Sequence, residues 1–535
     1  MQELAGLMRH ILSWMDRLMN RIFGWRYNPL YQSGSLVVVS LVVMLVTGLY
    51  LLLFYRIGGP YASIERISAQ AWGGSWIRAS HRYAADVAVV AALVHAARMF
   101  SQGRSWGPRV LAWLSGLVLV GLLYICAWTG YVMVWDGHGF VLAVEGARLL
   151  DALPLFSEPI VRTFVGERPI PGAFFFLNLF LHIAVPIGMA AGLWLHVSRV
   201  SRPVLVPPRP LWIGSVVALF AVSVLWPAPL DGPADPLLIP TDVKLDVLYG
   251  FWLPILQNIG PGVAWAAIVI GMTGLCAIPW LTRPKSDHQP EPSHVDQRSC
   301  TSCYQCYLDC PYEAIAMVNR TDGRDGMVAY VDPALCVSCG ICAGSCAPMG
   351  VGPPLRTGKH QLAEVEAFIA EQKPTRDQVV IVGCDRSVVE GRAGSPVTAL
   401  LENEGVGSSQ GGSSPVLSVT CAGNLHSSVV EYLVRAGAGG VLVVACPPRD
   451  CWSREGPIWM EQRFFHERGA DLKERVDRAR IRIAYAASGE SAALGVALRD
   501  FREDVAALAD ESVEETIDIL AECESADGLT SEVGR

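Results

Sequence analysis

Residues 78–98 read RASHRYAADVAVVAALVHAAR, and residues 182–196 read HIAVPIGMAAGLWLH. Both stretches are apolar, and each carries two histidines 14 residues apart: His81 and His95, and His182 and His196. Fourteen residues of α-helix rise about 21 Å and return to nearly the same face. Each stretch therefore predicts a membrane helix with one ligand near each leaflet. Two such helices side by side would form two bis-histidine sites stacked across the bilayer.

A lone histidine in an apolar helix is more often a satisfied polar group or a member of a proton relay than a metal ligand. Ionisable residues inside a membrane are nevertheless costly and usually functional. The chain has only 11 histidines, and the same spacing occurs in two helices. This repetition favours axial ligation of iron, and we expect two b-type haems.

Six apolar segments are long enough to span about 30 Å of hydrocarbon: residues 33–55, 82–100, 110–135, 173–198, 211–229 and 262–282. Residues 1–282 are therefore expected to form an all-α, six-span membrane bundle with both termini on one side. Arginines concentrate before the first span, after the second and after the fourth, so the positive-inside bias places that side in the cytoplasm, at the inner membrane. Residues 1–26 lack a signal-peptide pattern and are typical of an amphipathic interfacial helix.

Glycines repeat the same 14-residue spacing in two further spans, at Gly34 and Gly48 and at Gly116 and Gly130. Glycine is also common in membrane helices for simple packing. Its coincidence with the histidine spacing indicates helices that flank the same two haems, because a porphyrin edge needs a residue without a side chain at its level.

Together with the histidines and glycines, several residues resemble the cytochrome b subunit of cytochrome bc complexes: Arg78, Arg98, Trp113, Thr129 to Val132, Ala152 to Pro154, and Pro186. The resemblance implies that His81 and His182 hold the outer haem, and that His95 and His196 hold the inner one. It also implies that Arg78 and Arg98 face haem propionates. Alternatively, either arginine extends to the membrane interface.

The outer quinol site of that family departs from the pattern. Its Pro-Glu-Trp-Tyr motif aligns with Leu245 to Leu248 here, where only the acid Asp246 remains, and no seventh or eighth span follows. Outer-face quinol oxidation with a Rieske partner is therefore not expected. Asp246 could accept a quinol proton, but an acid in such a loop is more often solvated.

A polar linker, residues 283–297, leads to two cysteine runs of the form CxxCxxCxxxC within residues 298–352. In two-cluster ferredoxins the fourth cysteine of each run ligates the other cluster. A small α+β domain with two [4Fe–4S] clusters is therefore predicted, one held by Cys300, Cys303, Cys306 and Cys346, the other by Cys336, Cys339, Cys342 and Cys310. Zinc is the weaker alternative.

Residues 376–500 alternate β-branched runs with helical stretches, which predicts a parallel α/β sheet. The runs 379–382, 416–419 and 441–444 are each followed within two residues by a cysteine, and the four cysteines of this part are Cys384, Cys421, Cys446 and Cys451. Ligands of open α/β sheets collect at the carboxyl ends of strands. These four are expected to hold one small cluster, although a cluster-free domain with buried cysteines is the alternative.

This domain resembles the delta subunit of methyl-viologen-reducing hydrogenases, through the runs around Thr420 to Gly423 and Cys446 to Cys451. The resemblance implies a [2Fe–2S] cluster and a partner of the heterodisulfide reductase type. Because Ser387 stands where the family often has a second cysteine, Cys451 is the expected fourth ligand.

The sequence thus predicts a multidomain membrane electron-transfer subunit that links the quinone pool with a cytoplasmic redox partner. The partner would resemble heterodisulfide reductase, a hydrogenase or a formate dehydrogenase, and a homodimer is compatible with this arrangement. Nucleic-acid binding is not expected, because the net charge is −8 and residues 501–535 form an acidic tail. Nucleotide binding is not expected either, since no glycine-rich phosphate motif follows a strand. The alternative is a membrane anchor and docking module without quinone chemistry of its own.

Overall fold

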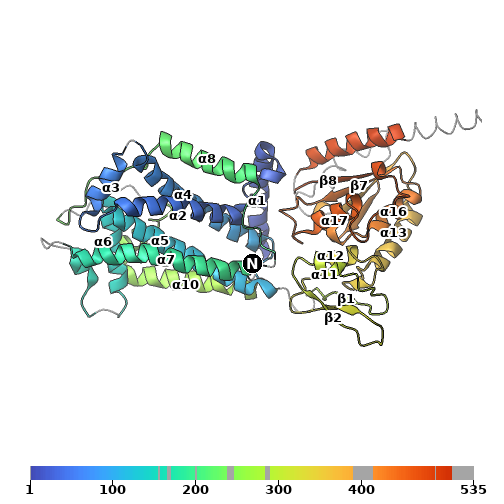
Figure 1. The fold of residues 1–535 in the computed structure, drawn as a ribbon, viewed down its shortest axis with the longest axis horizontal. Coiled ribbons are helices and arrows are strands. Elements are labelled where there is room, and N and C mark those ends of the chain that lie inside the picture. The colour runs from blue at the N-terminus through green and yellow to red at the C-terminus, as the bar shows by residue number, and fades with distance from the viewer. Residues whose placement is uncertain are drawn as a thin grey trace, which may run out of the picture. The chain divides into compact units, whose positions relative to one another are not determined.

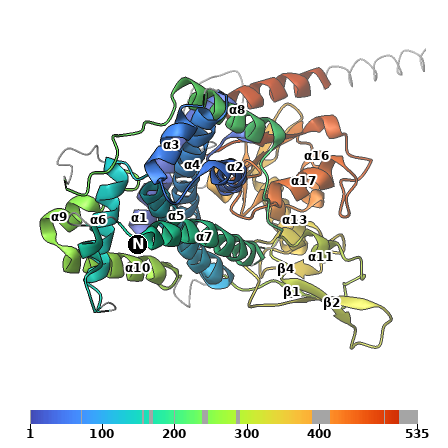
Figure 2. The same cartoon turned by 60° about the vertical axis from the view of Figure 1, so that its left-hand side comes forward.

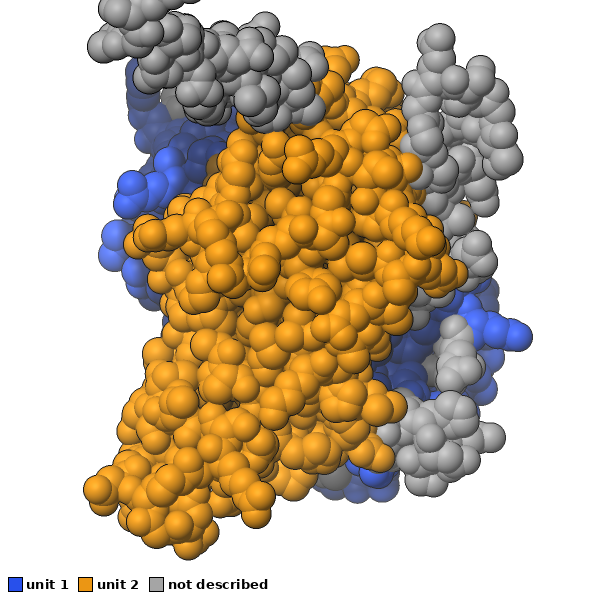
Figure 3. Space-filling model, turned by 90° about the vertical axis from the view of Figure 1, so that its right-hand side faces the viewer, with its two compact units in different colours: residues 1–9, 27–283 blue, residues 10–26, 284–535 orange. Residues whose placement is uncertain are grey.

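The computed structural model describes residues 2–70, 72–154, 157–164, 170–198, 200, 202–237, 246–283, 290–388, 414–487 and 490–508. They belong to two compact units, residues 1–9 with 27–283 and residues 10–26 with 284–535 (Figure 3). Parts of the predicted linker 283–297 and of the acidic tail 501–535 lie outside the described residues.

The membrane-like part of the chain is helical where it is described (Figure 1). Its elements are α1 (Gln2–Phe23), η1 (Trp25–Tyr27), α2 (Ser33–Phe54), α3 (Pro60–Ser68), α4 (Gly74–Ser101), η2 (Gly107–Arg109), α5 (Val110–Val134), α6 (Gly137–Asp151), η3 (Ile160–Phe164), α7 (Gly172–Ser198), α8 (Arg209–Leu225), α9 (Leu253–Ile259) and α10 (Pro261–Leu281).

Five described helical segments are long and apolar enough to cross a membrane: α2, α4, residues 107–134, α7 and α10. They coincide with five of the six predicted spans, and the chain is an integral membrane protein. The remaining prediction, residues 211–229, corresponds to α8, which has 17 residues. This helix stops at Leu225 because Pro227 and Pro229 follow, and proline lacks the N–H that continues a helix.

The long helices pack in pairs, α2 against α4 and α5 against α7 (Figures 1 and 2). Large apolar side chains remain on their outer surfaces, among them Leu45, Val46 and Leu53 of α2. Apolar side chains around the whole circumference are expected of helices whose solvent is lipid. On α1, the exposed apolar residues recur every three or four positions, as in the predicted amphipathic helix: Leu4, Leu7, Ile11, Trp14, Leu18 and Ile22.

The ferredoxin-like region consists of short elements around the eight cysteines. They are β1 (His294–Val295), α11 (Gln305–Asp309), β2 (Ile315–Asn319), β3 (Met327–Val331), α12 (Ile341–Gly344) and β4 (Val351–Gly352). β1 pairs with β4 and β2 with β3, both antiparallel. The long helix α13 (Gly358–Gln372) then leads to the last domain.

The last domain is built on a parallel sheet, as predicted. The sheet has the order β6-β5-β7-β8, with β5 (Val379–Cys384), β6 (Val416–Val419), β7 (Gly440–Ala445) and β8 (Ile481–Tyr485). The remaining described elements are α14 (Asp385–Val388), η5 (Ala422–Asn424), α16 (Ser427–Arg435), α17 (Gly456–Phe465), η6 (Arg478–Arg480) and a helix over residues 491–508. The sequence-based prediction missed β8, a short strand that contains the charged Arg482.

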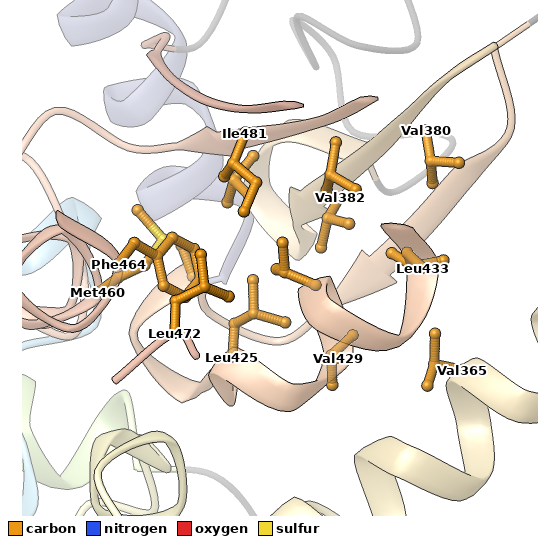
Figure 4. Packing of buried hydrophobic residues seen from close by; sticks show 14 of the residues in the cluster. Val365, Val380, Val382, Leu425, Val429, Leu433, Met460, Phe464, Leu472 and Ile481 are labelled. Carbon is orange, nitrogen blue, oxygen red and sulfur yellow. The ribbon is translucent and has the colours of Figure 1, made fainter. Parts of the chain in front are cut away.

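Both faces of this sheet are buried. Val380 and Val382 pack with Leu425, Leu433 and other residues of one hydrophobic cluster (Figure 4). Ile381 and Leu442 point to the opposite face, against Leu494, Leu498, Phe501 and Val505 of the helix over residues 491–508. Burial on two faces explains the continuous β-branched runs of β5 and β7.

Candidate functional site

The glycines of α2 lie directly opposite the histidines of α4. A Cβ atom added to Gly34 would stand 3.0 Å from Cε1 of His95, and one added to Gly48 would stand 3.1 Å from Cε1 of His81. With contacts this short, a side chain at either glycine would require the imidazole ring to shift by a few tenths of an ångström. The two 14-residue spacings are therefore in register along the helix pair.

α5 and α7 repeat the arrangement. A Cβ on Gly116 would meet His196 Cε1 at 3.3 Å, and one on Gly130 would meet His182 Cε1 at 3.0 Å. The sequence suggested that these glycines make room for a porphyrin edge. The close approach found here is to the imidazole ring itself, so the glycines fix how deeply each ring sits between its helices.

His81 and His182 face each other across the two helix pairs, with ring centroids 6.2 Å apart and ring planes tilted by 53°. A metal bound by one nitrogen of each ring requires two bonds of about 2 Å and roughly 1 Å from each nitrogen to its ring centre, about 6 Å in all. The observed separation fits a shared metal. His196 likewise lies close enough to His95 for their charges to interact.

Of the two predicted propionate-binding arginines, Arg98 is buried and Arg78 is half-buried. Arg78 Nη2 donates to the carbonyls of Ala228 and Pro229, the latter at 3.2 Å, whereas its buried Nε has no acceptor among the described residues. Arg98 lies with its guanidinium carbon 4.7 Å from the ring centre of Tyr31. A guanidinium with an unused, buried donor suits an acidic group that is bound later.

Asp246 is part of an ion-pair network. Arg82 contacts both Asp86 and Asp246, the latter at 2.6 Å, and Tyr131 donates a hydrogen bond to the same Asp246 oxygen. Burial acts to raise the pKa of Asp246, but the Tyr131 hydrogen bond and the Arg82 charge outweigh it and hold the pKa below its ordinary value. Such a carboxylate is a weak proton acceptor. The sequence reading identified Asp246 but missed Arg82 and Asp86.

The eight cysteines of the ferredoxin-like region line two separate cavities. One cavity is lined by Cys300, Cys303, Cys306 and Cys346. The other is lined by Cys310, Cys336, Cys339 and Cys342. In each cavity three cysteines of one run meet the last cysteine of the other run. The structure therefore brings together the same two groups of four that the spacing predicted.

The backbone around each cavity is wound in the same way. Ser302 and Tyr304 in the first run, and Ser338 and Gly340 in the second, have positive φ between 58° and 78°. When residues with positive and negative φ alternate, successive backbone N–H groups point into one concave site. Such a site favours an anionic ligand. Backbone N–H groups also reach sulfur: Ala314 reaches Cys310 at 3.4 Å and Gly350 reaches Cys346 at 3.3 Å. Four thiols with N–H donors around a cavity fit an iron–sulfur cluster.

The remaining four cysteines meet at one edge of the parallel sheet. Cys384 ends β5, and Cys421 and Cys446 follow β6 and β7 within two residues; with Cys451 they form one buried cluster. The sulfur atoms of Cys384 and Cys446 are 3.5 Å apart. Hydrogen bonding from Cys451 lowers the pKa of Cys421 to about 7. The pKa of Cys446 is lowered as well. Four thiols that lie within hydrogen-bonding distance of one another suit a metal cluster, which displaces their protons when it binds.

Arg386 stands beside this group. Its Nη1 lies 3.5 Å from Cys446 Sγ, and its Nη2 forms an ion pair of 3.1 Å with Asp450. Its guanidinium carbon lies 4.8 Å from the ring centre of Trp452. A fixed positive charge next to thiolate ligands compensates the negative charge of an iron–sulfur cluster.

The ferredoxin-like region and the parallel-sheet domain are joined by buried polar side chains within one compact unit. Arg463 has no exposed surface and donates to Ser345 Oγ at 3.1 Å and to the carbonyls of Gly423 at 2.9 Å and Leu425 at 3.3 Å. Asn424 Nδ2 donates to the Gly340 carbonyl at 2.8 Å. Gly340 follows Cys339, and Asn424 lies three residues after Cys421, so one hydrogen bond connects the second cysteine cavity with the sheet-edge cysteines.

Three hydroxyl side chains that the sequence reading missed contact the histidines of the membrane part. Thr47, Ser115 and Thr129 lie 3.0 Å from Nδ1 of His81, His196 and His182, respectively. Each of the three directly precedes one of the conspicuous glycines. The sequence places each of them one residue before a conspicuous glycine, but it does not show that the hydroxyl would meet a histidine nitrogen.

Comparison with known proteins gives three family matches: cytochrome b/b6/petB over residues 21–202, a 4Fe–4S dicluster domain over 299–350, and the delta subunit of methyl-viologen-reducing hydrogenase over 402–509. Cys384 lies ahead of the third match. The menaquinol:cytochrome c reductase cytochrome b subunit of Geobacillus thermodenitrificans is 26% identical over 176 residues, which cover 32% of this chain and 79% of that protein.

Cytochrome b of Rickettsia typhi is 26% identical over 288 residues, covering 48% of this chain and 72% of that protein. The solved structure of a hyperthermophilic respiratory Complex III aligns with a TM-score of 0.39 at 19% sequence identity, covering 49% of this chain and 78% of that chain. The chain thus contains one region that matches cytochrome b/b6, one that matches a 4Fe–4S dicluster domain and one that matches the delta subunit of methyl-viologen-reducing hydrogenase.

Proposed function

We propose that this membrane electron-transfer subunit moves electrons between the quinone pool and a cytoplasmic redox partner. Two b haems, two [4Fe–4S] clusters and one [2Fe–2S] cluster would supply the one-electron chemistry. The observation that carries the proposal is the pairing of all four histidines with four glycines in two facing helix pairs. The relative that acts on menaquinol supports a quinol as the membrane substrate.

Each group of residues has a distinct part in this proposal. His81 with His182, and His95 with His196, would hold the two haems. Each cysteine cavity would hold one [4Fe–4S] cluster, and the four sheet-edge cysteines would hold the [2Fe–2S] cluster. The hydrogen bond from Asn424 to the Gly340 carbonyl links the second cysteine cavity with the sheet-edge cysteines. The rest of this connection is a short stretch of backbone on either side.

We also propose six spans rather than five, with α8 as the additional one. α8 follows the end of α7, and the chain after α8 returns to the opposite end of the bundle, where the Gly137 amide donates to the Gly232 carbonyl at 3.0 Å just beyond α5. The Arg78 bonds to Ala228 and Pro229 lie near the start of α4. Seventeen helical residues extend about 26 Å, close to the hydrocarbon thickness. With six spans, both termini and the iron–sulfur domains share the cytoplasmic side.

The test is the haem content of the purified full chain. We expect a b-type band in the reduced-minus-oxidised spectrum that a menaquinol analogue can reduce. His95→Ala combined with His182→Ala should remove both haems, whereas His138→Ala, at a buried histidine of α6 that faces no glycine, should retain both. A chain without a b-type band would favour the docking-module alternative, and a band that persists in the double variant would refute the ligand assignment.

Proton acceptance by Asp246 at an outer quinol site is a separate candidate, and its ion pair with Arg82 argues against it. Asp246→Asn should leave quinol-dependent haem reduction within about twofold of the parent, because a carboxylate already neutralised by Arg82 has little proton affinity. A loss of more than about tenfold would instead place quinol chemistry at Asp246.

A further inference from the structure

Three of the four paired histidines share the same hydrogen-bond arrangement. Nδ1 of His81, His182 and His196 lies 3.0 Å from a hydroxyl oxygen of the facing helix, supplied by Thr47, Thr129 and Ser115. The glycine after each hydroxyl residue contacts the same ring. The two residues therefore act on the same imidazole. The hydroxyl makes a polar contact with it, and the glycine leaves space for it.

The direction of these hydrogen bonds follows from the other contacts of the hydroxyls. A hydroxyl has one proton to donate, and each of these donates it to a backbone carbonyl of its own helix: Thr47 to Val43 at 2.7 Å, Ser115 to Leu111 at 2.7 Å and Thr129 to Cys126 at 2.9 Å. Such back-bonding is common for Ser and Thr in membrane helices. With the proton committed to the carbonyl, the hydroxyl oxygen is left to accept from Nδ1–H.

A second acceptor fixes the same tautomer. Nδ1 of His182 also lies 3.1 Å from the Cys126 carbonyl, which can only accept. The backbone of Met44 and that of Ala112 also act on the rings of His81 and His196 by hydrogen bonding. Met44, Ala112 and Cys126 each lie three residues before the hydroxyl residue. Nδ1 is therefore the protonated nitrogen in all three rings, and Nε2 keeps its lone pair.

We propose that Thr47, Ser115 and Thr129 are positioning residues that hold three histidines in the Nδ1–H tautomer and so present Nε2 to the haem iron. This inference rests on the proposed function, because it assumes that haem binds at these histidines. An acceptor on the distal N–H makes the imidazole a stronger donor to the metal, which stabilises the oxidised iron. The hydroxyls therefore lower the reduction potentials of the haems.

The test uses Thr129→Val, Thr47→Val and Ser115→Ala in the full-length protein. Each keeps the shape of the side chain nearly unchanged but removes the hydroxyl acceptor, so the histidine N–H keeps only the helix carbonyl. We expect haem content to remain at the parent level and the midpoint potential of one haem to rise. Thr47→Val and Thr129→Val should raise the same haem, and Ser115→Ala should raise the other. Thr129→Ser restores the hydroxyl and should return the parent potential.

Ser223→Ala is the matched control. Ser223 is buried in α8, and its hydroxyl donates to the Leu219 carbonyl at 2.7 Å in the same intrahelical manner. Its loss should leave both potentials unchanged. If Thr129→Val loses its haem while Thr129→Ser keeps it, the positioning role is again supported, because the two differ in the hydroxyl.

Three outcomes contradict the inference. Potentials that stay at the parent value with haem intact would overturn it and leave the proposed function standing. An equal shift in Ser223→Ala would assign the effect to general helix perturbation. A parent protein without haem would overturn the proposed function itself, and this inference with it.

Discussion

At the residue scale, the four paired glycines stand where a histidine ring of the neighbouring helix leaves little space for a side chain. The Cβ positions of the four paired glycines lie 3.0 to 3.3 Å from imidazole atoms, while Gly121 of α5 has open space within 4 Å. The paired glycines therefore differ from Gly121 in what they face. Each paired glycine meets a histidine ring, whereas Gly121 faces open space.

This difference gives the first prediction, on Gly130. Gly130→Val should displace the His182 ring, because a Cβ there meets Cε1 at 3.0 Å and the larger side chain of valine needs more space than the Cβ alone. We expect a loss of about half of the bound haem, measured as haem per protein in purified samples. Gly121→Val, in the same helix, should keep the full complement. Equal haem in the two variants would show that the glycine contact does not position the ring.

At the element scale, α12, η5 and α17 are held together by one buried arginine. Arg463 of α17 donates to Ser345 beside α12 and to carbonyls at Gly423 and Leu425 around η5. Burial lowers the pKa of Arg463 to about 10, so it remains charged at neutral pH. The cost of burying this charge is offset by its three hydrogen-bond acceptors.

Arg463→Met tests this junction. The change leaves the three acceptors buried without a donor, which should cost roughly 2–3 kcal/mol and lower the melting temperature of the soluble unit by roughly 4–10 °C. The melting temperature is measured by following the loss of iron–sulfur absorbance on heating. Arg435→Met is the control, because Arg435 is 59% exposed and its ion pair with Glu431 is 3.7 Å long. That change should shift the melting temperature by no more than a few degrees.

At the scale of the whole molecule, the side of the membrane on which the iron–sulfur domains lie depends on α8. If α8 crosses, the soluble domains share a compartment with the N-terminus. If it does not, α10 carries them to the opposite side. The arginines that flank the spans favour the first arrangement by the positive-inside bias.

Reporter fusions at three points decide between the two arrangements. We expect a fusion after residue 205 to report the cytoplasm, one after residue 235 to report the outer side, and one after residue 290 to report the cytoplasm again, because α8 and α10 each cross once. If the fusions after residues 205 and 235 report the same side of the membrane, α8 does not cross it. A fourth fusion, in the loop of residues 102–109, serves as the cytoplasmic reference.

The sequence by itself determined the features that are periodic along the chain. The apolar helices, the 14-residue histidine and glycine spacings, the two cysteine runs and the three β-branched strands were all visible, since helical and strand periods fix which residues share a face. The grouping of Cys310 with Cys336, Cys339 and Cys342 also followed from spacing, and the cavity has the same lining.

Only the tertiary structure decided the contacts between elements distant in sequence. It set Thr47, Ser115 and Thr129 against histidine nitrogens, gathered Arg82 and Asp86 around Asp246, and brought Arg463 to Ser345. It also revealed β8 and the early end of α8. These contacts depend on how whole helices and strands pack, and local sequence period carries no information about which polar side chain will stand at a given height on the neighbouring element.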